Sequence, residues 1–328
     1  MNPYIVADIG GTNARFGIAS KQGINNVQVF PCNAFENFEN VFAAYFETLN
    51  DKSIKHAAIA IATHVSDDEV EFTNLPWAFS ISKVAKKHNF EKFKVLNDLA
   101  ASAISIPLLN ENQTIKICNN NEVPMSAKAL IAAGTGLGMS GLLPTGEMWM
   151  PVAGEGGHMS LCATTKFEYE LLKLLFLKHG YVSAEMVLSG RGLTNLHAAV
   201  AKINDEALND LLPAEIVTKG VSGEDKHCEL VLNTYCGFLG SVAGDLALIL
   251  GAQNGMYIGG GIVNHMRDFF VKNTHFMKHF INKGQKENYM KKIPIHMISD
   301  TQIGLLGAYE SRKQAYENIG FTWSADSK

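Results

Sequence analysis

The chain has 328 residues, which is enough for two domains that each bury a sizeable core. Hydrophobic residues make up 47% and charged residues 18%, the composition of an ordinary soluble globular protein. The net charge of −4 gives no electrostatic reason to expect nucleic acid or an anionic membrane as a partner.

The first third of the chain alternates between strand and helix patterns, which predicts an α/β domain with parallel strand pairing. Residues 4–20 read as a strand, a glycine turn and a second strand. Residues 57–63 are small and apolar throughout, so we expect a strand that is covered on both faces. A strand is also expected at 93–98, with helices at 41–49, 80–89 and 100–106, the last stopped by Pro107.

A polar, turn-rich segment over residues 110–126 is expected to lead into a second unit. That unit begins with a strand near residue 130 and a further glycine turn. Helices are then expected at 166–179, 193–203 and 227–250, and a strand with a closing glycine turn at 255–263. A last helix over 303–316 is expected to pack back on the first domain.

The two glycine turns are Gly10-Gly-Thr-Asn13 and Gly134-Thr-Gly136, each placed between apolar runs. Glycines and a threonine at a turn expose backbone N–H groups and a hydroxyl, which suits phosphate oxygens close to the backbone. One such turn is common in hairpins. Two in one chain, with an acid (Asp8) only before the first, predict a duplicated fold that holds a nucleotide between its halves.

Asn97 and Asp98 stand where a predicted strand hands over to a helix. Ligand sites in open α/β sheets lie outside the carboxyl ends of strands, so this is a favoured place for a catalytic group. The alternative is a helix cap, since both residue types are good N-caps, and the two interpretations are compatible. A carboxylate here can accept the proton of a substrate hydroxyl during phosphoryl transfer.

Three further polar residues stand in glycine-rich or apolar sequence. Glu155 and His158 lie among three glycines, where they form either a simple hydrogen-bonded pair or part of a site. Glu185 begins a predicted helical turn, where capping is the alternative. Together with Asn97 and Asp98 they suit a neutral ligand that has many hydroxyls.

At this point the sequence resembles the bacterial glucokinase family, of the hexokinase/actin-like ATPase superfamily. Eight stretches match in family order over nearly the whole chain: 8–15, 74–80, 96–98, 133–138, 154–158, 182–190, 259–263 and 304–307.

The resemblance implies ATP-dependent phosphorylation of glucose at its 6-hydroxyl, the first step of glycolysis. Asp98 matches the family's catalytic base. The residues that match sugar contacts are Asn97, Glu155, His158 and Glu185, with Asn74 near the same pocket. The residues that match the ATP site are Gly10, Gly11, Thr12 and Asn13 in the first phosphate turn, Gly134, Thr135 and Gly136 in the second, and Gly260 and Gly261 beside adenosine. Asp8 would support the Mg²⁺ of Mg-ATP through water.

The fold that the resemblance implies is two α/β domains of actin/hexokinase (ribonuclease H-like) type with a cleft between them. We expect a small domain over residues 1–107 plus 302–328 and a large one over 108–301. A homodimer is the family-level expectation.

Two positions depart from the family pattern. Arg191 stands where a proline is expected, and Thr63-His64 replaces a more usual Cys-Pro pair. Neither touches a predicted catalytic group.

Three alternative functions stay open at this stage. A kinase for another hexose is the nearest. An actin-like or chaperone-type ATPase would have similar nucleotide turns, but it gives no reason for the sugar-facing residues. A sugar-sensing protein that has lost catalysis is disfavoured by the presence of Asp98 and both phosphate turns.

The remaining features point to no further chemistry. His275 and His279 have the spacing of a zinc pair, yet no ligand accompanies them, so we expect a solvated helix face. No cysteine except Cys162 lies near His158, which disfavours the ROK family and its Cys-rich zinc loop. The five scattered cysteines indicate a reducing compartment. With no basic N-terminal region and no unbroken apolar stretch of 18 residues, we expect a cytoplasmic protein without a membrane span.

Overall fold

The computed structural model describes residues 2–326. Contacts between residues divide the chain into two compact units. Unit 1 contains residues 1–109, 145–153 and 300–328, and unit 2 contains residues 110–144 and 154–299. The division at 107/108 and 301/302 that the sequence led us to expect stays a prediction.

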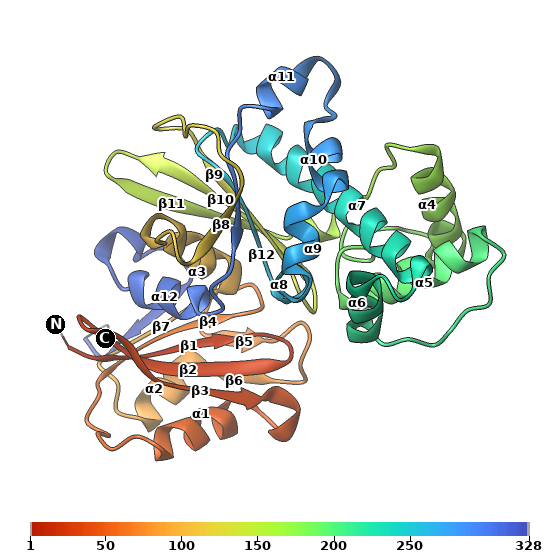
Figure 1. Cartoon of the computed structure of the whole chain (residues 1–328). Helices are drawn as coiled ribbons and strands as arrows, with labels where there is room; N and C mark the ends of the chain where they lie inside the picture. The colour runs from red at the N-terminus through yellow and green to blue at the C-terminus, as the bar shows by residue number, and fades with distance from the viewer. Residues whose placement is uncertain (1, 327–328) are drawn as a thin grey trace. The chain divides into compact units, whose positions relative to one another are not determined.

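Unit 1 is built on a mixed sheet with the order β14-β7-β4-β1-β2-β3 (Figure 1). Its strands are β1 (Tyr4–Ile9), β2 (Asn13–Ser20), β3 (Gly23–Pro31), β4 (His56–Ile61), β7 (Lys92–Asn97) and β14 (Phe321–Ser324). β4 runs parallel to both β1 and β7, and the remaining pairs are antiparallel. A separate two-stranded hairpin consists of β5 (Glu69–Glu71) and β6 (Ala78–Ser80).

Helices cover both faces of this sheet because its central strands are apolar on both sides. Alternate residues of β1, such as Ile5 and Ile9, pack in the cluster that contains α1 (Phe38–Glu47) and α2 (Ile81–Lys87). Val6 points the other way and packs with Leu305 of α12 (Ile303–Glu310). α3 (Asp98–Ser105) lies on the same side as α12 (Figure 1).

Unit 2 repeats the arrangement with the sheet order β11-β10-β9-β12-β13-β8. Its strands are β8 (Thr114–Cys118), β9 (Lys128–Ala133), β10 (Leu137–Thr145), β11 (Met148–Gly154), β12 (Met256–Gly259) and β13 (Ile295–Ile298). β12 runs parallel to both β9 and β13. β10 is antiparallel to β9, and β8 is antiparallel to β13. In each unit, three strands that are consecutive in the chain form one side of the sheet, and two parallel strands and an antiparallel edge strand follow on the other side. This shared order confirms the predicted duplication.

The helices of unit 2 are α4 (Lys166–His179), α5 (Gly190–Ile203), α6 (Pro213–Ser222), α7 (Lys226–Leu250), α8 (Gly261–His265), α9 (Arg267–Lys272), α10 (Thr274–Ile281) and α11 (Glu287–Met290). α7 lies at the centre of the helical part, between α5, α6 and α10 (Figure 1).

One helix, α7, resembles a membrane span in length and average hydropathy, although Asn233 and Asp245 interrupt its apolar sequence. Within residues 2–326, this helix is the one that passes a test of length and hydropathy. However, 72% of its apolar window is buried inside the structure. Its apolarity therefore reflects the core of unit 2, where Tyr235, Phe238 and Leu239 are fully buried.

Candidate active site

Three strand ends of unit 1 meet at one edge of its sheet. The pairing register places Ile9 of β1 beside Ile61 of β4, and Ile61 beside Asn97 of β7. The Ala62 N–H extends this contact, since it donates to the Ile9 carbonyl at 3.0 Å. The first glycine turn, residues 62–63 and Asp98 therefore follow directly from neighbouring strands at the carboxyl edge, where α/β folds bind ligands.

The first glycine turn joins β1 to β2 and is closed by its own backbone. The Gly10 N–H donates to the Asn13 carbonyl at 3.0 Å, and the Cys32 N–H donates to the Thr12 carbonyl at 2.8 Å. The buried Cys32 thiol also donates to the Gly10 carbonyl at 3.5 Å. Thr12 and Asn13 are exposed, so the tip of the turn is open to a ligand while its base is fixed.

Asp8 is the penultimate residue of β1 and stands two residues before this turn. Its carboxylate is 3.6 Å from the Arg15 guanidinium, and Arg15 also donates to the Thr301 carbonyl at 2.7 Å. A Cβ added at Gly304, in the first turn of α12, would lie 2.5 Å from the Asp8 carboxylate. Burial raises the pKa of Asp8, and the nearby Arg15 charge opposes that rise.

These surroundings fit an Mg²⁺ ion held through water with a nucleotide. A single, partly exposed carboxylate is a common protein contribution when substrate phosphates supply the other ligands. Among residues 2–326 there is no group of three or more His, Cys, Asp or Glu side chains that could cage a metal by themselves. Sequence reasoning missed Arg15, although its position opposite Asp8 follows from the β1–β2 hairpin register.

Asn97 and Asp98 begin α3, and the cap interpretation is confirmed. The Asn97 side-chain oxygen accepts from the N–H groups of Leu99 and Ala100 at 3.0 and 3.1 Å. Its amide nitrogen donates to Asp98 Oδ1 at 3.2 Å, and the Leu99 N–H donates to the same oxygen at 2.8 Å. Capping therefore fixes the orientation of the Asp98 carboxylate at the sheet edge.

Asn74 is exposed in the loop between β5 and β6. Its neighbour Thr73 lies with its hydroxyl 3.2 Å from the hydroxyl of Thr63. The Thr63 carbonyl in turn accepts from the Asn97 amide at 3.2 Å. The loop with Asn74 is thus tied to the strand edge that holds Asp98.

In unit 2 the second glycine turn occupies the place, between β9 and β10, that the first turn occupies in unit 1. The Gly134 N–H donates to the Gly136 carbonyl at 2.8 Å, and the Gly190 N–H donates to the Gly134 carbonyl at 2.9 Å. Gly260 has φ +99°, and a Cβ there would lie 2.1 Å from the Ala133 carbonyl oxygen. Only glycine therefore allows the end of β12 to approach the residue before the turn so closely.

Glu185 lies directly against the second turn. One of its carboxylate oxygens accepts the Leu137 N–H at 2.9 Å, and a Cβ at Gly136 would be 2.6 Å from that oxygen. The Glu185 N–H donates to the Gly157 carbonyl at 2.8 Å. Residues 184–188 form one helical turn, in which the Leu188 N–H donates to the Ala184 carbonyl at 2.8 Å, and α5 begins only at Gly190.

Glu155 and His158 lie on a short 3₁₀ turn, on either side of the residue whose carbonyl accepts from the Glu185 N–H, and both are exposed. The His158 N–H donates to the Glu155 carbonyl at 3.0 Å, and the Tyr181 hydroxyl donates to the His158 carbonyl at 2.6 Å. A Cβ at Gly157 would lie 2.0 Å from the Leu137 carbonyl. Unit 2 thus brings Glu155, His158, Glu185 and its glycine turn to one place.

The expectation for His279 was wrong. His275 is exposed, but His279 is 7% exposed and its Nε2 lies 2.9 Å from a carboxylate oxygen of Glu168 on α4. Gly237 of α7 makes the room, since a Cβ there would meet the ring at 3.0 Å. The two histidines therefore do not form one solvated face, because His279 is buried against Glu168.

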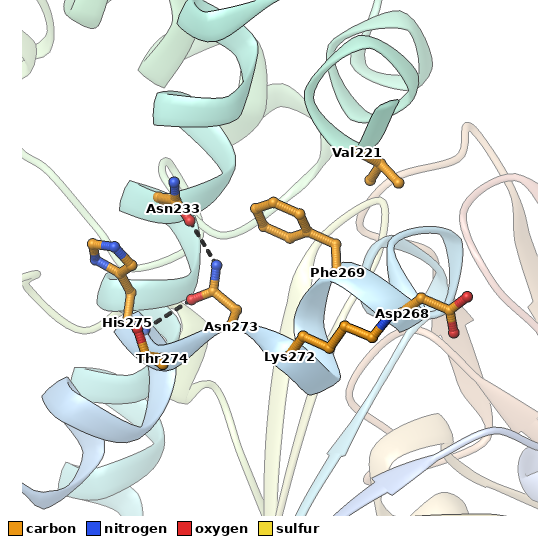
Figure 2. A pocket seen from close by; sticks show the side chains of 8 residues that line it. All are labelled: Val221, Asn233, Asp268, Phe269, Lys272, Asn273, Thr274 and His275. Carbon is orange, nitrogen blue, oxygen red and sulfur yellow. Dashed lines mark hydrogen bonds between the residues drawn. The ribbon is translucent and has the colours of Figure 1, made fainter. Parts of the chain in front are cut away.

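A cavity of about 420 Å³ lies elsewhere in unit 2, between the end of α6, α7, α9 and the start of α10 (Figure 2). Figure 2 shows Asn273 and Asn233 joined by a hydrogen bond of 2.6 Å, with Phe269 and Val221 at the other side. No residue that the sequence predicted for the site lines this cavity.

Comparison with known proteins shows the family and the fold of the chain. The model of the glucokinase family matches residues 5–315. A glucokinase of Saccharophagus degradans is 36% identical over 313 residues, which cover 94% of this chain and 97% of that protein. The crystal structure of a glucokinase from an Antarctic psychrotroph is 35% identical, with a TM-score of 0.82 and coverage of 94% and 98%. A glucokinase of Balamuthia mandrillaris, solved in complex with glucose, shares the fold at 17% identity, with a TM-score of 0.79 and coverage of 95% and 94%. The predicted two-domain α/β fold is confirmed.

Proposed function

The chain belongs to the glucokinase family, and from that premise we propose that Asp98 is the general base of its reaction. The activity is the ATP-dependent phosphorylation of glucose, the first step of glycolysis. In the proposed mechanism Asp98 takes the proton from the sugar 6-hydroxyl as that oxygen attacks the γ-phosphorus of ATP.

The observation that carries this proposal is the orientation of Asp98 at the carboxyl edge of β7. The Leu99 N–H and the Asn97 amide both donate to Asp98 Oδ1. A base must be held within hydrogen-bond reach of the proton that it removes, and a fixed carboxylate lowers the entropic cost of that arrangement.

For ATP we propose the two glycine turns, residues 10–13 and 134–136, as the phosphate-binding backbone. Gly260 and Gly261 would lie beside adenosine, since side chains there would obstruct it. Asp8 would hold Mg²⁺ through water, and the ion, when bound, neutralises charge on the phosphate oxygens. The fixed base and open tip of the first turn support this role.

For glucose we propose contacts from Asn74, Asn97, Glu155, His158 and Glu185. Asn74, Glu155, His158 and Glu185 can each donate to or accept from a sugar hydroxyl. Asn97 would exchange one of its present hydrogen bonds for a bond to the sugar. Sites of this kind discriminate strongly against analogues that lack a hydroxyl, because a buried polar group is then left unpaired.

Replacing Asp98 by Asn tests the proposal. Asn keeps the shape of the side chain but is no base, so kcat should fall about 10²–10⁴-fold while glucose affinity changes little. A coupled assay gives kcat, and calorimetry gives the affinity. Near-normal turnover with intact glucose binding would remove Asp98 from this role. The same assay over a panel of hexoses measures how strict the glucose preference is.

We also propose that the chain acts as a homodimer. Tyr169 and Phe176 are exposed on α4, and Leu177 and Tyr181 are exposed beside them. Tyr169 and Phe176 are seven residues apart and so lie on one face of the helix. Apolar patches of this kind mark interaction sites more often than free surface. The molecular mass in solution, measured by light scattering, tests the proposal.

The cytoplasm is the compartment that we propose. Its support is that ATP is the phosphoryl donor and that none of the five cysteines is in a disulfide in the described part of the chain.

A further inference from the structure

Thr63 is a buried polar residue directly after β4, and it is one of the two positions where the chain departs from the family pattern. Its side chain is 9% exposed. The hydroxyl donates to the Glu71 carbonyl at 2.9 Å and lies 3.2 Å from the Thr73 hydroxyl. Because a hydroxyl has one proton, which Thr63 gives to Glu71, Thr73 is the donor in the second contact.

These bonds hold the exposed part of the loop between β5 and β6. The base of this loop is closed by the Phe72 N–H, which donates to the Trp77 carbonyl at 2.9 Å. Phe72 and Trp77 are both buried, whereas Thr73 and Asn74 are exposed. The Thr63–Thr73 contact is therefore a side-chain anchor at the residue next to Asn74.

The main chain of Thr63 is joined to the other side of the site. Its carbonyl accepts from the Asn97 amide nitrogen at 3.2 Å, and the same nitrogen donates to Asp98 Oδ1 at 3.2 Å. One residue thus connects the loop of Asn74 with the carboxylate of Asp98, entirely within unit 1.

We propose that Thr63 is a positioning residue that sets the place of Asn74, and so the affinity for the sugar, relative to Asn97 and Asp98. The proposal rests on the function proposed above, since it takes Asn74 as a glucose contact. Threonine suits this role better than the cysteine expected from the family pattern, because a thiol is a weak donor to the Glu71 carbonyl and a weak acceptor from Thr73.

Thr63→Val is the main test, because it removes the hydroxyl but keeps the shape and the carbonyl. The loss of the hydroxyl's bonds to Glu71 and Thr73 should raise the KM for glucose about 3–10-fold and leave the KM for ATP within about twofold. Thr63→Ser keeps a hydroxyl and should restore the glucose KM. Thr73→Val removes only the Thr63–Thr73 contact and does so from an exposed position, so it should also raise the glucose KM, by less than Thr63→Val, and it keeps the test open if Thr63→Val folds poorly.

Thr48→Val is the matched control. The Thr48 hydroxyl donates to the Tyr45 carbonyl at 2.7 Å, also in unit 1. Its loss removes a hydrogen bond of the same kind and should change neither KM.

A double-mutant cycle separates positioning from general destabilisation. If Thr63 acts through Asn74, Thr63→Val should raise the glucose KM less than about twofold in an Asn74→Ala background. Additive effects, an equal rise in the KM for ATP, or failure of Thr63→Ser to restore the glucose KM would overturn the proposal.

The unmodified chain and Asp98→Asn, run in the same assay, keep the two proposals apart. Normal turnover by Asp98→Asn counts against the proposed base alone, whereas a normal glucose KM for Asn74→Ala removes the sugar contact on which this inference rests. If Asp98→Asn fails as expected while Thr63→Val and Thr73→Val keep a normal glucose KM, only the role of Thr63 is refuted.

Discussion

Glu168 and His279 show how one residue can serve two elements. Besides His279, Glu168 accepts from the N–H and hydroxyl of Thr164 and from the Thr165 N–H, which caps α4. Burial alone would raise the pKa of Glu168, but the hydrogen bonds from His279 and Thr164 lower it. The hydrogen bond to Glu168 raises the pKa of His279 against the effects of burial and Lys278. The pair joins α4 to α10.

The pKa directions predict a pH-dependent effect of Glu168→Gln, which keeps an acceptor for the cap. Because the pKa of His279 is raised in the folded state, the histidine contributes its full stabilisation below pH about 6.5. This stabilisation is lost as the pH rises through the pKa of the folded state. Because the pKa of Glu168 is lowered in the folded state, the glutamate contributes its full stabilisation above pH about 4.5, and this stabilisation is lost on acidification. The loss in free energy of unfolding should therefore be largest near pH 5–6, about 3–5 kcal/mol, and shrink above pH 7.

Urea unfolding at several pH values measures this dependence. Glu170→Gln is the control, since Glu170 pairs with Lys173 on the exposed side of the same helix. A loss in Glu168→Gln that is the same at pH 5.5 and 8.5 would contradict the assignment.

Sequence reasoning at the residue scale succeeded where local chemistry decides the structure. The capping role of Asn97 follows from its type and its place between a strand and a helix. His279 could not be placed in this way. Its partner is 111 residues away in the chain, and nothing in the helical spacing of His275 and His279 reveals a glycine on a third helix.

At the scale of elements, α3 and α12 owe their close packing to glycine. A Cβ at Gly307 would lie 1.7 Å from the Ala101 carbonyl oxygen, a backbone atom of α3 that cannot turn aside. Gly304, one turn earlier, leaves room for the Asp8 carboxylate. The glycines of the 304–307 motif therefore let α12 pack closely against α3, which begins with Asp98, and against Asp8, which precedes the first phosphate turn.

Gly307→Ala should force the two helices apart. We expect a loss of about 1–3 kcal/mol in the free energy of unfolding, together with a lower kcat, because α3 carries Asp98 at its first position. Gly261→Ala is the steric control for stability, since a Cβ there would meet no atom closer than 3.9 Å. An unfolding midpoint for Gly307→Ala equal to that of the unmodified chain would refute the packing argument.

Element boundaries were predicted well where one periodic pattern dominates. The helix expected at 227–250 is α7, Lys226–Leu250. The helix expected over 303–316 ends at Glu310, since the residues that follow form turns. β8 and β14 were missed because short edge strands show too few alternating residues: β8 lies in the segment expected to be a polar connection, and β14 has four half-buried residues.

At the scale of the whole molecule, the residues proposed for one substrate are divided between two units of equivalent topology. Asn74, Asn97 and Asp98 belong to unit 1, and Glu155, His158 and Glu185 belong to unit 2. The duplication could be inferred from the sequence because the turns that repeat are glycine-rich. The segment 145–153, which groups with unit 1, could not, since tertiary contacts alone decide its place.

This division predicts how glucose changes thermal stability. A ligand that binds the folded chain and not the unfolded one stabilises the fold, so glucose at about 100 times its Kd should add about 2.7 kcal/mol, a rise of about 4 °C in Tm for a chain of this length. Asn74→Ala in unit 1 and His158→Ala in unit 2 replace exposed side chains, so neither should change Tm without glucose. Each should reduce the glucose-induced rise, and His179→Ala, an exposed histidine on α4, should leave it intact. Scanning calorimetry at a fixed glucose concentration measures these changes in Tm. If Asn74→Ala or His158→Ala shows the full glucose-induced rise in Tm, the replaced residue does not hold the sugar.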